Sequence, residues 1–152
     1  MTRRLSAAVP AALAALGATL LAACPAPAGE LGAKANYLLR CSGCHGPKGV
    51  GTIEGGIPPF PGFVGPLVAD DAGRTYVMHV PGVVGSSLSD AEIAAVLNYI
   101  VEAWSDGAPA PFTTEEVVRR RAEPMPDLIA YRRAIVARLA KDGVTLADYP
   151  WP

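Results

Sequence analysis

The segment from Gly46 to Pro66 leaves little room for regular secondary structure, because 12 of its 21 residues are glycine or proline. Glycine weakens helices and strands, and proline cannot donate a backbone hydrogen bond. We therefore expect one long wrapping loop here. A loop of this length is uncommon in a compact domain unless it has a function.

The composition suggests a thin protein core. The chain has 152 residues, a length typical of one domain, and although 51% of them are hydrophobic only 7% are aromatic. Much of the hydrophobic content is alanine and leucine in residues 1–28. A formal net charge of −1 excludes nucleic-acid binding through general basicity. We expect a group other than protein to complete the core.

The N-terminus has the pattern of an export signal. Arg3 and Arg4 precede an apolar stretch over residues 7–23, so residues 1–28 are predicted to be a signal peptide, cleaved after Ala28. The alternative is cleavage before Cys24, which would then carry a lipid and anchor the protein to a membrane. Either route places the mature protein in an oxidising compartment outside the cytoplasm.

Hydrophobic periodicity and capping residues predict an all-α fold without a credible strand pair. The most distinct helix begins after Ser89, which with Glu92 has the pattern of a capping box. The linker 108–111 contains prolines and separates residues 29–107 from a C-terminal helical extension. The helices are expected in residues 31–45, 70–80, 89–104, 113–121 and 127–141.

The sequence Cys41-Ser42-Gly43-Cys44-His45 is the most specific chemical signal in the chain. On a helical turn, two thiols three residues apart can both add to the vinyl groups of one haem. The imidazole that follows can then bind the iron as the proximal ligand. This spacing predicts one covalently attached haem c, which would also supply the missing core.

Other readings of the two cysteines fit less well. A thioredoxin-like motif needs a surrounding βαβ pattern, which is not evident. A zinc site needs further Cys or His ligands, and only His79 is left for this role, because Cys24 is expected to be removed or to carry a lipid. A disulfide between Cys41 and Cys44 would not require His45.

Residues 30–105 resemble small class I cytochromes c. The resemblance rests on Cys41 to Gly46 near the end of a first helix, on the Gly/Pro-rich loop, and on Leu88 to Ile93 opening a helix that contains Leu97-Asn98-Tyr99-Ile100. It implies helices wrapped around haem c, with the first and last crossing where Leu38 or Tyr37 meets Leu97 or Ile100. It also implies single-electron transfer in the periplasm.

The sequence offers several candidates for the sixth iron ligand. The family usually places a methionine shortly before the last helix, and Met78 is the nearest candidate although its neighbours do not reproduce the usual Met-Pro pair. His79 and Met125 are the alternatives, and an open site is the fourth. Methionine ligation would raise the reduction potential relative to two histidines.

A proline carbonyl is expected to accept a hydrogen bond from the free ring nitrogen of His45 and to orient the imidazole. Pro58, Pro59 and Pro66 are the candidates, and the sequence does not choose among them.

Charge is unevenly divided. Residues 29–111 contain four basic and eight acidic residues, and residues 112–141 contain seven basic and four acidic ones. The favoured interpretation is a solvated helical face, and the alternative is an arm that docks on an acidic redox partner or an anionic surface.

Together these features predict a soluble periplasmic electron carrier and not an enzyme, because no catalytic triad, carboxylate pair or phosphate loop accompanies the haem motif. Its partners would be redox proteins such as a dehydrogenase or an oxidase. The alternative is a haem protein with an open distal site that senses gas or acts like a peroxidase.

Overall fold

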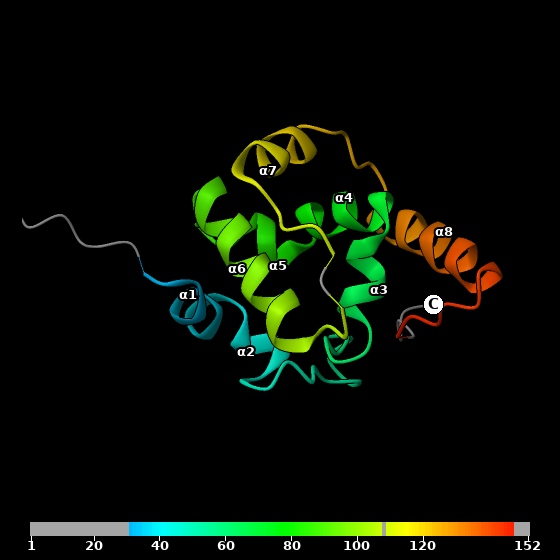
Figure 1. The fold of residues 1–152 in the computed structure, drawn as a ribbon, viewed down its shortest axis with the longest axis horizontal. Coiled ribbons are helices and arrows are strands. Elements are labelled where there is room, and N and C mark those ends of the chain that lie inside the picture. The colour runs from blue at the N-terminus through cyan, green and yellow to red at the C-terminus, as the bar shows by residue number, and fades with distance from the viewer. Residues whose placement is uncertain (1–30, 108, 148–152) are drawn as a thin grey trace, which may run out of the picture. The chain divides into compact units, whose positions relative to one another are not determined.

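Eight helices make up the part of the chain that the computed structural model describes, residues 31–107 and 109–147 (Figure 1). The predicted signal peptide and Cys24 lie outside these residues. The all-α fold class is confirmed, and between residues 31 and 147 the only strand-like pairing described is one isolated bridge between Thr52 and Ile57. The helices are α1 Ala33–Arg40, α2 Ser42–His45, α3 Val64–Ala69, α4 Asp71–His79, α5 Pro81–Val84, α6 Asp90–Trp104, α7 Thr114–Arg121 and α8 Leu128–Lys141.

The helix predicted over residues 31–45 is divided in two. Cys41 leaves the helical path between α1 and α2, with φ −116° and ψ −35°. The loop prediction for the Gly/Pro-rich segment holds from Gly46 to Phe63, and α3 then begins at Val64, which the sequence interpretation missed.

Gly51 shows why the loop needs glycine. Its φ is 62°, and a Cβ placed there would lie 2.2 Å from the carbonyl oxygen of Ile57. Any other residue would therefore open the turn that closes between Thr52 and Ile57.

The two longest helices within residues 31–107, α4 and α6, both begin at side-chain caps. Asp70 accepts a hydrogen bond from the amide of Gly73 at 2.8 Å and starts α4. Ser89 and Glu92 form the capping box of α6, with the side chain of each residue bonded to the backbone amide of the other. Between them lies the single turn α5, which begins at Pro81 and was not predicted.

The core lies where α1, α3, α4 and α6 meet. The inward face of α6 contributes Ile93, Val96, Leu97 and Ile100, all at most 7% exposed. The predicted contact of the first helix with α6 is present. Tyr37 rather than Leu38 is the buried residue of α1, because Tyr37 is 0% and Leu38 is 46% exposed.

The C-terminal extension packs on the rest of the described fold. Helix α7 contacts α4 and α6, and α8 contacts α4 (Figure 1). The connection before α7 is fastened to α6, because Asn98 donates to the carbonyl of Phe112 at 2.9 Å and accepts from its amide at 2.7 Å. Both helices begin close to their predicted starts, α7 with Thr113 and α8 with Asp127 as the side-chain cap.

No helix in residues 31–107 or 109–147 has the length and apolar character needed to cross a membrane.

Candidate haem-binding site

The turn after α1 brings the two cysteines and the histidine of the motif together. The carbonyl of Cys41 accepts hydrogen bonds from the amides of Cys44 at 3.2 Å and of His45 at 3.0 Å. Cys41 is half-buried and packs against the core, whereas Cys44 is exposed, and both are free thiols. The two sulfurs are therefore carried on one helical turn, as the motif predicted.

The imidazole of His45 is oriented by a backbone carbonyl. Its Nδ1 lies 3.2 Å from the carbonyl oxygen of Pro58. A carbonyl oxygen can only accept, so Nδ1 carries the proton and the lone pair of Nε2 is available to a metal. Pro58 is one of the three candidate prolines, and Pro66 lies in α3.

Aromatic packing holds the same ring. Phe60 stacks on the imidazole of His45 with the ring centroids 4.0 Å apart and the planes 17° apart, and Trp104 of α6 stacks on Phe60 at 5.6 Å. Burial lowers the pKa of His45, and the bond to Pro58 opposes this effect. Burial thus favours the neutral ring, which is the form that binds metal ions.

Gly49 allows this stack to form. A Cβ at Gly49 would lie 3.0 Å from both Phe60 and Trp104, and its φ is 68°. The loop backbone therefore runs directly over the aromatic pair, a position that only glycine occupies without displacing it.

Tyr37 connects the motif to the core. Its hydroxyl donates to the carbonyl of Gly46 at 2.5 Å, and its ring lies 5.0 Å from Trp104 and 5.7 Å from Tyr99. Burial raises the pKa of Tyr37 to about 12, with the neighbouring Cys41 as a smaller cause. Burial, followed by the charge of Cys44, also raises the pKa of the Cys41 thiol.

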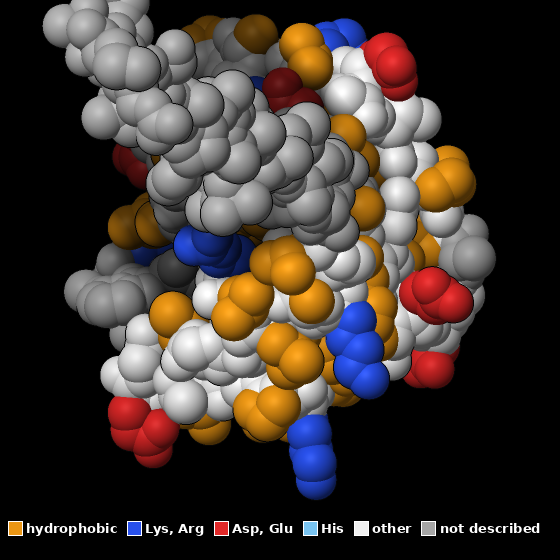
Figure 2. Space-filling model, turned by 90° about the vertical axis from the view of Figure 1, so that its left-hand side faces the viewer, with side chains coloured by type: hydrophobic (Ala, Val, Ile, Leu, Met, Phe, Trp, Pro, Cys, Tyr) orange, Lys and Arg blue, Asp and Glu red, His pale blue; other side chains and the backbone are white. Residues whose placement is uncertain are grey.

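The surface beside the motif is unusually apolar. Leu38, Leu39 and Val50 are 46%, 65% and 60% exposed. Figure 2 shows hydrophobic side chains gathered on this side of the molecule. Two thiols, an imidazole with a free Nε2 and an exposed apolar surface are the features that a covalently held haem needs, so the residues fit the group.

The three candidate sixth ligands lie in different environments. Met78 is 0% exposed and belongs to the core cluster against which Cys41 packs. His79 donates from Nε2 to the carbonyl of Arg120 at 3.0 Å, so its ring is held toward α7. Met125 is partly buried in the connection between α7 and α8.

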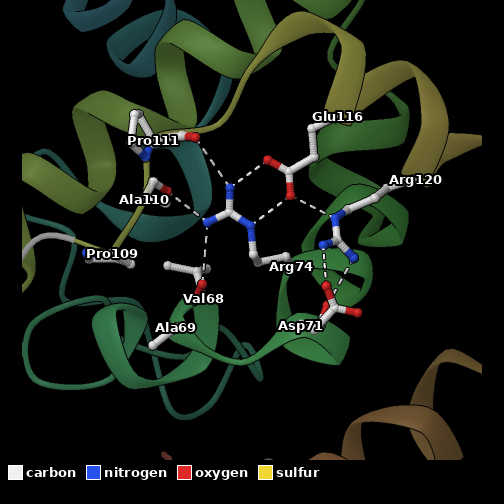
Figure 3. A pocket seen from close by; sticks show the side chains of 9 residues that line it. All are labelled: Val68, Ala69, Asp71, Arg74, Pro109, Ala110, Pro111, Glu116 and Arg120. Atoms are coloured by element: carbon white, nitrogen blue, oxygen red, sulfur yellow. Dashed lines mark hydrogen bonds and ion pairs between the residues drawn. The ribbon is translucent and has the colours of Figure 1, made fainter.

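A second polar cluster, which sequence reasoning missed, joins α4 to the extension (Figure 3). Arg74 donates to both carboxylate oxygens of Glu116, at 2.7 Å and 2.5 Å, and Arg120 donates to Glu116 at 2.7 Å and to Asp71 at 2.5 Å. The guanidinium of Arg74 also lies 3.8 Å from the centre of the Phe112 ring. The two arginines are only 9% and 4% exposed. The uneven division of charge along the sequence was its one visible signal.

These side chains line a shallow pocket of about 360 Å³ between α4, the connection 109–111 and α7. The guanidinium and carboxylate groups that line it bond to one another and to backbone carbonyls, including Ala110 at 2.9 Å from Arg74. The cluster is therefore a structural joint.

No group of three or more His, Cys, Asp or Glu side chains that could hold a metal ion occurs in the described residues.

Comparison with known proteins identifies two similar chains, both cytochromes c-552 of Thermus thermophilus. One is 37% identical over an alignment that covers 60% of this chain and 86% of the relative. The other is 38% identical, with 60% of this chain and 76% of the relative covered. No protein-family model matches the chain.

Proposed function

The chain belongs to the c-type cytochromes, electron-transfer proteins with covalently bound haem c, and we propose that it is a small class I member with one haem that works in the periplasm. The observation that carries the proposal is the geometry at His45. Within the Cys-x-x-Cys-His turn, Nδ1 is committed to the carbonyl of Pro58 and Nε2 is left as the ligand atom.

Each residue of the motif has one role in the proposal. Cys41 and Cys44 hold the haem through thioether bonds, and His45 is the proximal iron ligand. When bound, the haem iron takes up and releases one electron as it alternates between the ferric and ferrous states. Pro58 and Phe60 keep the imidazole in one orientation, so that the ligand does not rearrange as the charge changes.

Met78 is the proposed sixth ligand. Its support is that the thioether belongs to the buried cluster that Cys41 borders, whereas the ring of His79 is engaged with Arg120. A methionine ligand favours ferrous iron and gives a closed, six-coordinate site suited to electron transfer.

The proposed location and organisation follow from the sequence. Residues 1–28 act as the signal peptide, residues 29–107 form the cytochrome domain, and residues 108–152 form its linker and helical extension. The protein is released in soluble form, with a lipid on Cys24 as the alternative. A dehydrogenase or an oxidase of the same compartment is the proposed electron partner.

The absorption spectrum of protein matured in a bacterial periplasm tests the haem assignment. The reduced pyridine adduct should have the position expected of two thioether bonds, and Cys44→Ala should shift it toward that of a single bond. An adduct without a haem c signature would contradict the proposal. Ser42→Ala, which keeps both thiols, is the control.

Variants of α4 test the sixth ligand. Met78→Ala should abolish the ferric methionine-to-iron charge-transfer band and permit rapid binding of carbon monoxide, and His79→Ala should do neither. If the unmodified protein already binds carbon monoxide rapidly, the site is open and the Met78 assignment is wrong.

A further inference from the structure

The last turn of α4 carries two adjacent side chains that can bind iron, Met78 and His79. Successive residues of an α-helix point about 100° apart, because one turn contains about 3.6 residues. Only one of the two can therefore face the core that Cys41 borders. In the structure Met78 is 0% exposed in that core, and the ring of His79 is turned to the carbonyl of Arg120. The rotation of α4 about its own axis thus decides which side chain is presented.

Burial alone does not fix this rotation. A helix with one polar face keeps its rotation by keeping that face in water. The middle of α4 has no such face, because every residue from Gly73 to Met78 is buried. This segment covers more than a full turn, so apolar and polar positions are enclosed alike. The rotation of α4 must therefore be set by specific polar contacts.

One residue of α7 supplies such contacts along the length of α4. The side chain of Arg120 donates to the backbone carbonyl of Asp71 at 3.0 Å, to its carboxylate at 2.5 Å and to the hydroxyl of Thr75 at 2.6 Å (Figure 3 shows the bonds to Asp71). The carbonyl of Arg120 accepts from Nε2 of His79 at 3.0 Å. Asp71, Thr75 and His79 follow one another at intervals of four residues and so lie on one side of α4. A single residue thus holds this side from the first turn to the last.

The contact is fastened on a neighbouring side of α4 as well. Glu116 accepts from Arg120 at 2.7 Å and from Arg74 at 2.7 Å and 2.5 Å, and Arg74 precedes Met78 by four residues. Both arginines are buried, so these charge-assisted bonds are shielded from water. A turn of α4 that brought His79 inward would break the bonds on both sides. The proton on Nε2 of His79 also blocks this nitrogen as a ligand atom while the bond to Arg120 lasts.

We infer that Arg120 is a positioning residue that selects the sixth iron ligand, because it fixes the rotation of α4 so that Met78 is presented and His79 is withheld. The inference rests on the proposed function, in which Met78 is the ligand. It gives the C-terminal extension a role besides stability. Since a methionine ligand raises the reduction potential relative to a second histidine, the contact from α7 also sets that potential.

The spectrum and the potential of the holoprotein test the inference in Arg120→Ala. This variant loses the side-chain bonds to Asp71 and Thr75, while Glu116 keeps its pair with Arg74. The ferric protein should lose the methionine-to-iron charge-transfer band. The ratio of ferrous to ferric protein at a fixed applied potential should fall about tenfold, which is about 59 mV for one electron. Carbon monoxide should still not bind rapidly, because His79 takes the place of Met78.

A second substitution separates ligand selection from a general loss of stability. Adding His79→Ala to Arg120→Ala should restore the charge-transfer band and the potential, because Met78 then has no competitor. The added substitution introduces no new contact, so a merely structural role of Arg120 would give no such recovery.

Two further variants serve as a control and as a milder test. Arg121→Ala removes the same charge from the same helix, but its partner is Asp90 of α6, and it should keep the band and the potential. Thr75→Val removes one hydroxyl bonded to Arg120 at nearly unchanged volume. It should lower the potential in the same direction by a smaller factor.

An unchanged band and potential in Arg120→Ala, or in Thr75→Val where Arg120→Ala carries no haem, would overturn the inference. So would a loss of the band together with rapid binding of carbon monoxide, or a loss that His79→Ala does not reverse, since His79 would then not be the competing ligand. Absence of the band from the unmodified holoprotein would be a different failure. It would show that the Met78 assignment of the proposed function is wrong, and the inference would fall with it.

Discussion

The α1–α6 junction and the α4–α7 junction are both buried, but they are held by opposite kinds of chemistry. At the first, Tyr37, Tyr99 and Trp104 pack ring against ring, and one hydroxyl bond ties them to Gly46. At the second, Arg74 and Arg120 share the carboxylate of Glu116. Aromatic packing depends weakly on pH and salt, whereas the ion pairs of a shared carboxylate stabilise the junction only while the carboxylate is charged. The packing of α1, which precedes the haem motif, should therefore depend less on pH and salt than the attachment of α7.

The largest loss is expected at the aromatic junction. Tyr37→Ala would leave a cavity among three rings and free the carbonyl of Gly46, and should lower the free energy of unfolding by about 4 kcal/mol. Tyr37→Phe removes only the hydroxyl and should cost about 1 kcal/mol. Urea unfolding of the holoprotein measures both values.

Val118→Ala is the matched control for a truncation, because Val118 is 52% exposed on α7. It should change the stability by less than about 0.5 kcal/mol. A Tyr37→Ala protein as stable as this control would show that the α1–α6 contact contributes little.

The second largest loss of stability is expected at the ionic junction between α4 and α7. Glu116→Gln removes the charge shared by two buried guanidinium groups and should destabilise the protein by about 3 kcal/mol, since the cations remain buried without it. Glu115→Gln, on the exposed side of the same turn, is the control and should have little effect. Equal losses in the two variants would remove the special role assigned to Glu116.

Acid should weaken the same junction selectively. Hydrogen bonds from Arg74 and then Arg120 lower the pKa of Glu116 to about 2 from an ordinary value of 4.5. A depressed folded pKa means that the stabilisation is complete above about pH 5 and is lost as the pH falls toward 2, with a total of about 3 kcal/mol. The stability difference between wild type and Glu116→Gln should therefore shrink over this range. A difference that stays constant down to pH 2 would contradict the shared-carboxylate explanation.

The smallest effect is expected at the exposed attachment of α8. Arg138 pairs with Asp70 but is 49% exposed, so Arg138→Ala should lower the stability only slightly, and this effect should vanish in about 0.5 M salt. Asp70 also caps α4, so Asp70→Asn is preferred to Asp70→Ala as its partner variant. A large loss of stability that does not depend on salt would mean that α8, like α7, is attached through a buried ion pair.

The parts of this fold that could be predicted are those determined by residues close together in the sequence. The Ser89 and Glu92 pair located the start of α6, Thr113 and Asp127 located α7 and α8, and glycine and proline located the loop. The short helices α3 and α5 were missed because each is a turn or two whose stability comes from packing. Hydrophobic periodicity predicts one continuous helix over residues 31–45, and it does not show that the helix is interrupted at Cys41.

Only the Cys-x-x-Cys-His part of the candidate site could be predicted from the sequence. The spacing of Cys41, Cys44 and His45 predicts one helical turn, and the structure has that turn. The stack of Phe60 on His45 and the choice of Pro58 depend on how a loop returns through space, for which no local pattern exists. The pairing of Arg74 with Glu116 joins residues 42 positions apart and appeared in the sequence only as unbalanced charge.

The lengths of chain between bonded residues also set an order of assembly. Tyr37 and Gly46 are nine positions apart, whereas Arg74 finds its partners 36 and 42 positions later and Asp71 is bonded 49 positions later. Contacts between near neighbours close small loops and form quickly, and distant ones wait for the chain between them. A polypeptide made from its N-terminus can thus arrange its two thiols and its imidazole before the helices that will fasten α4 have been synthesised.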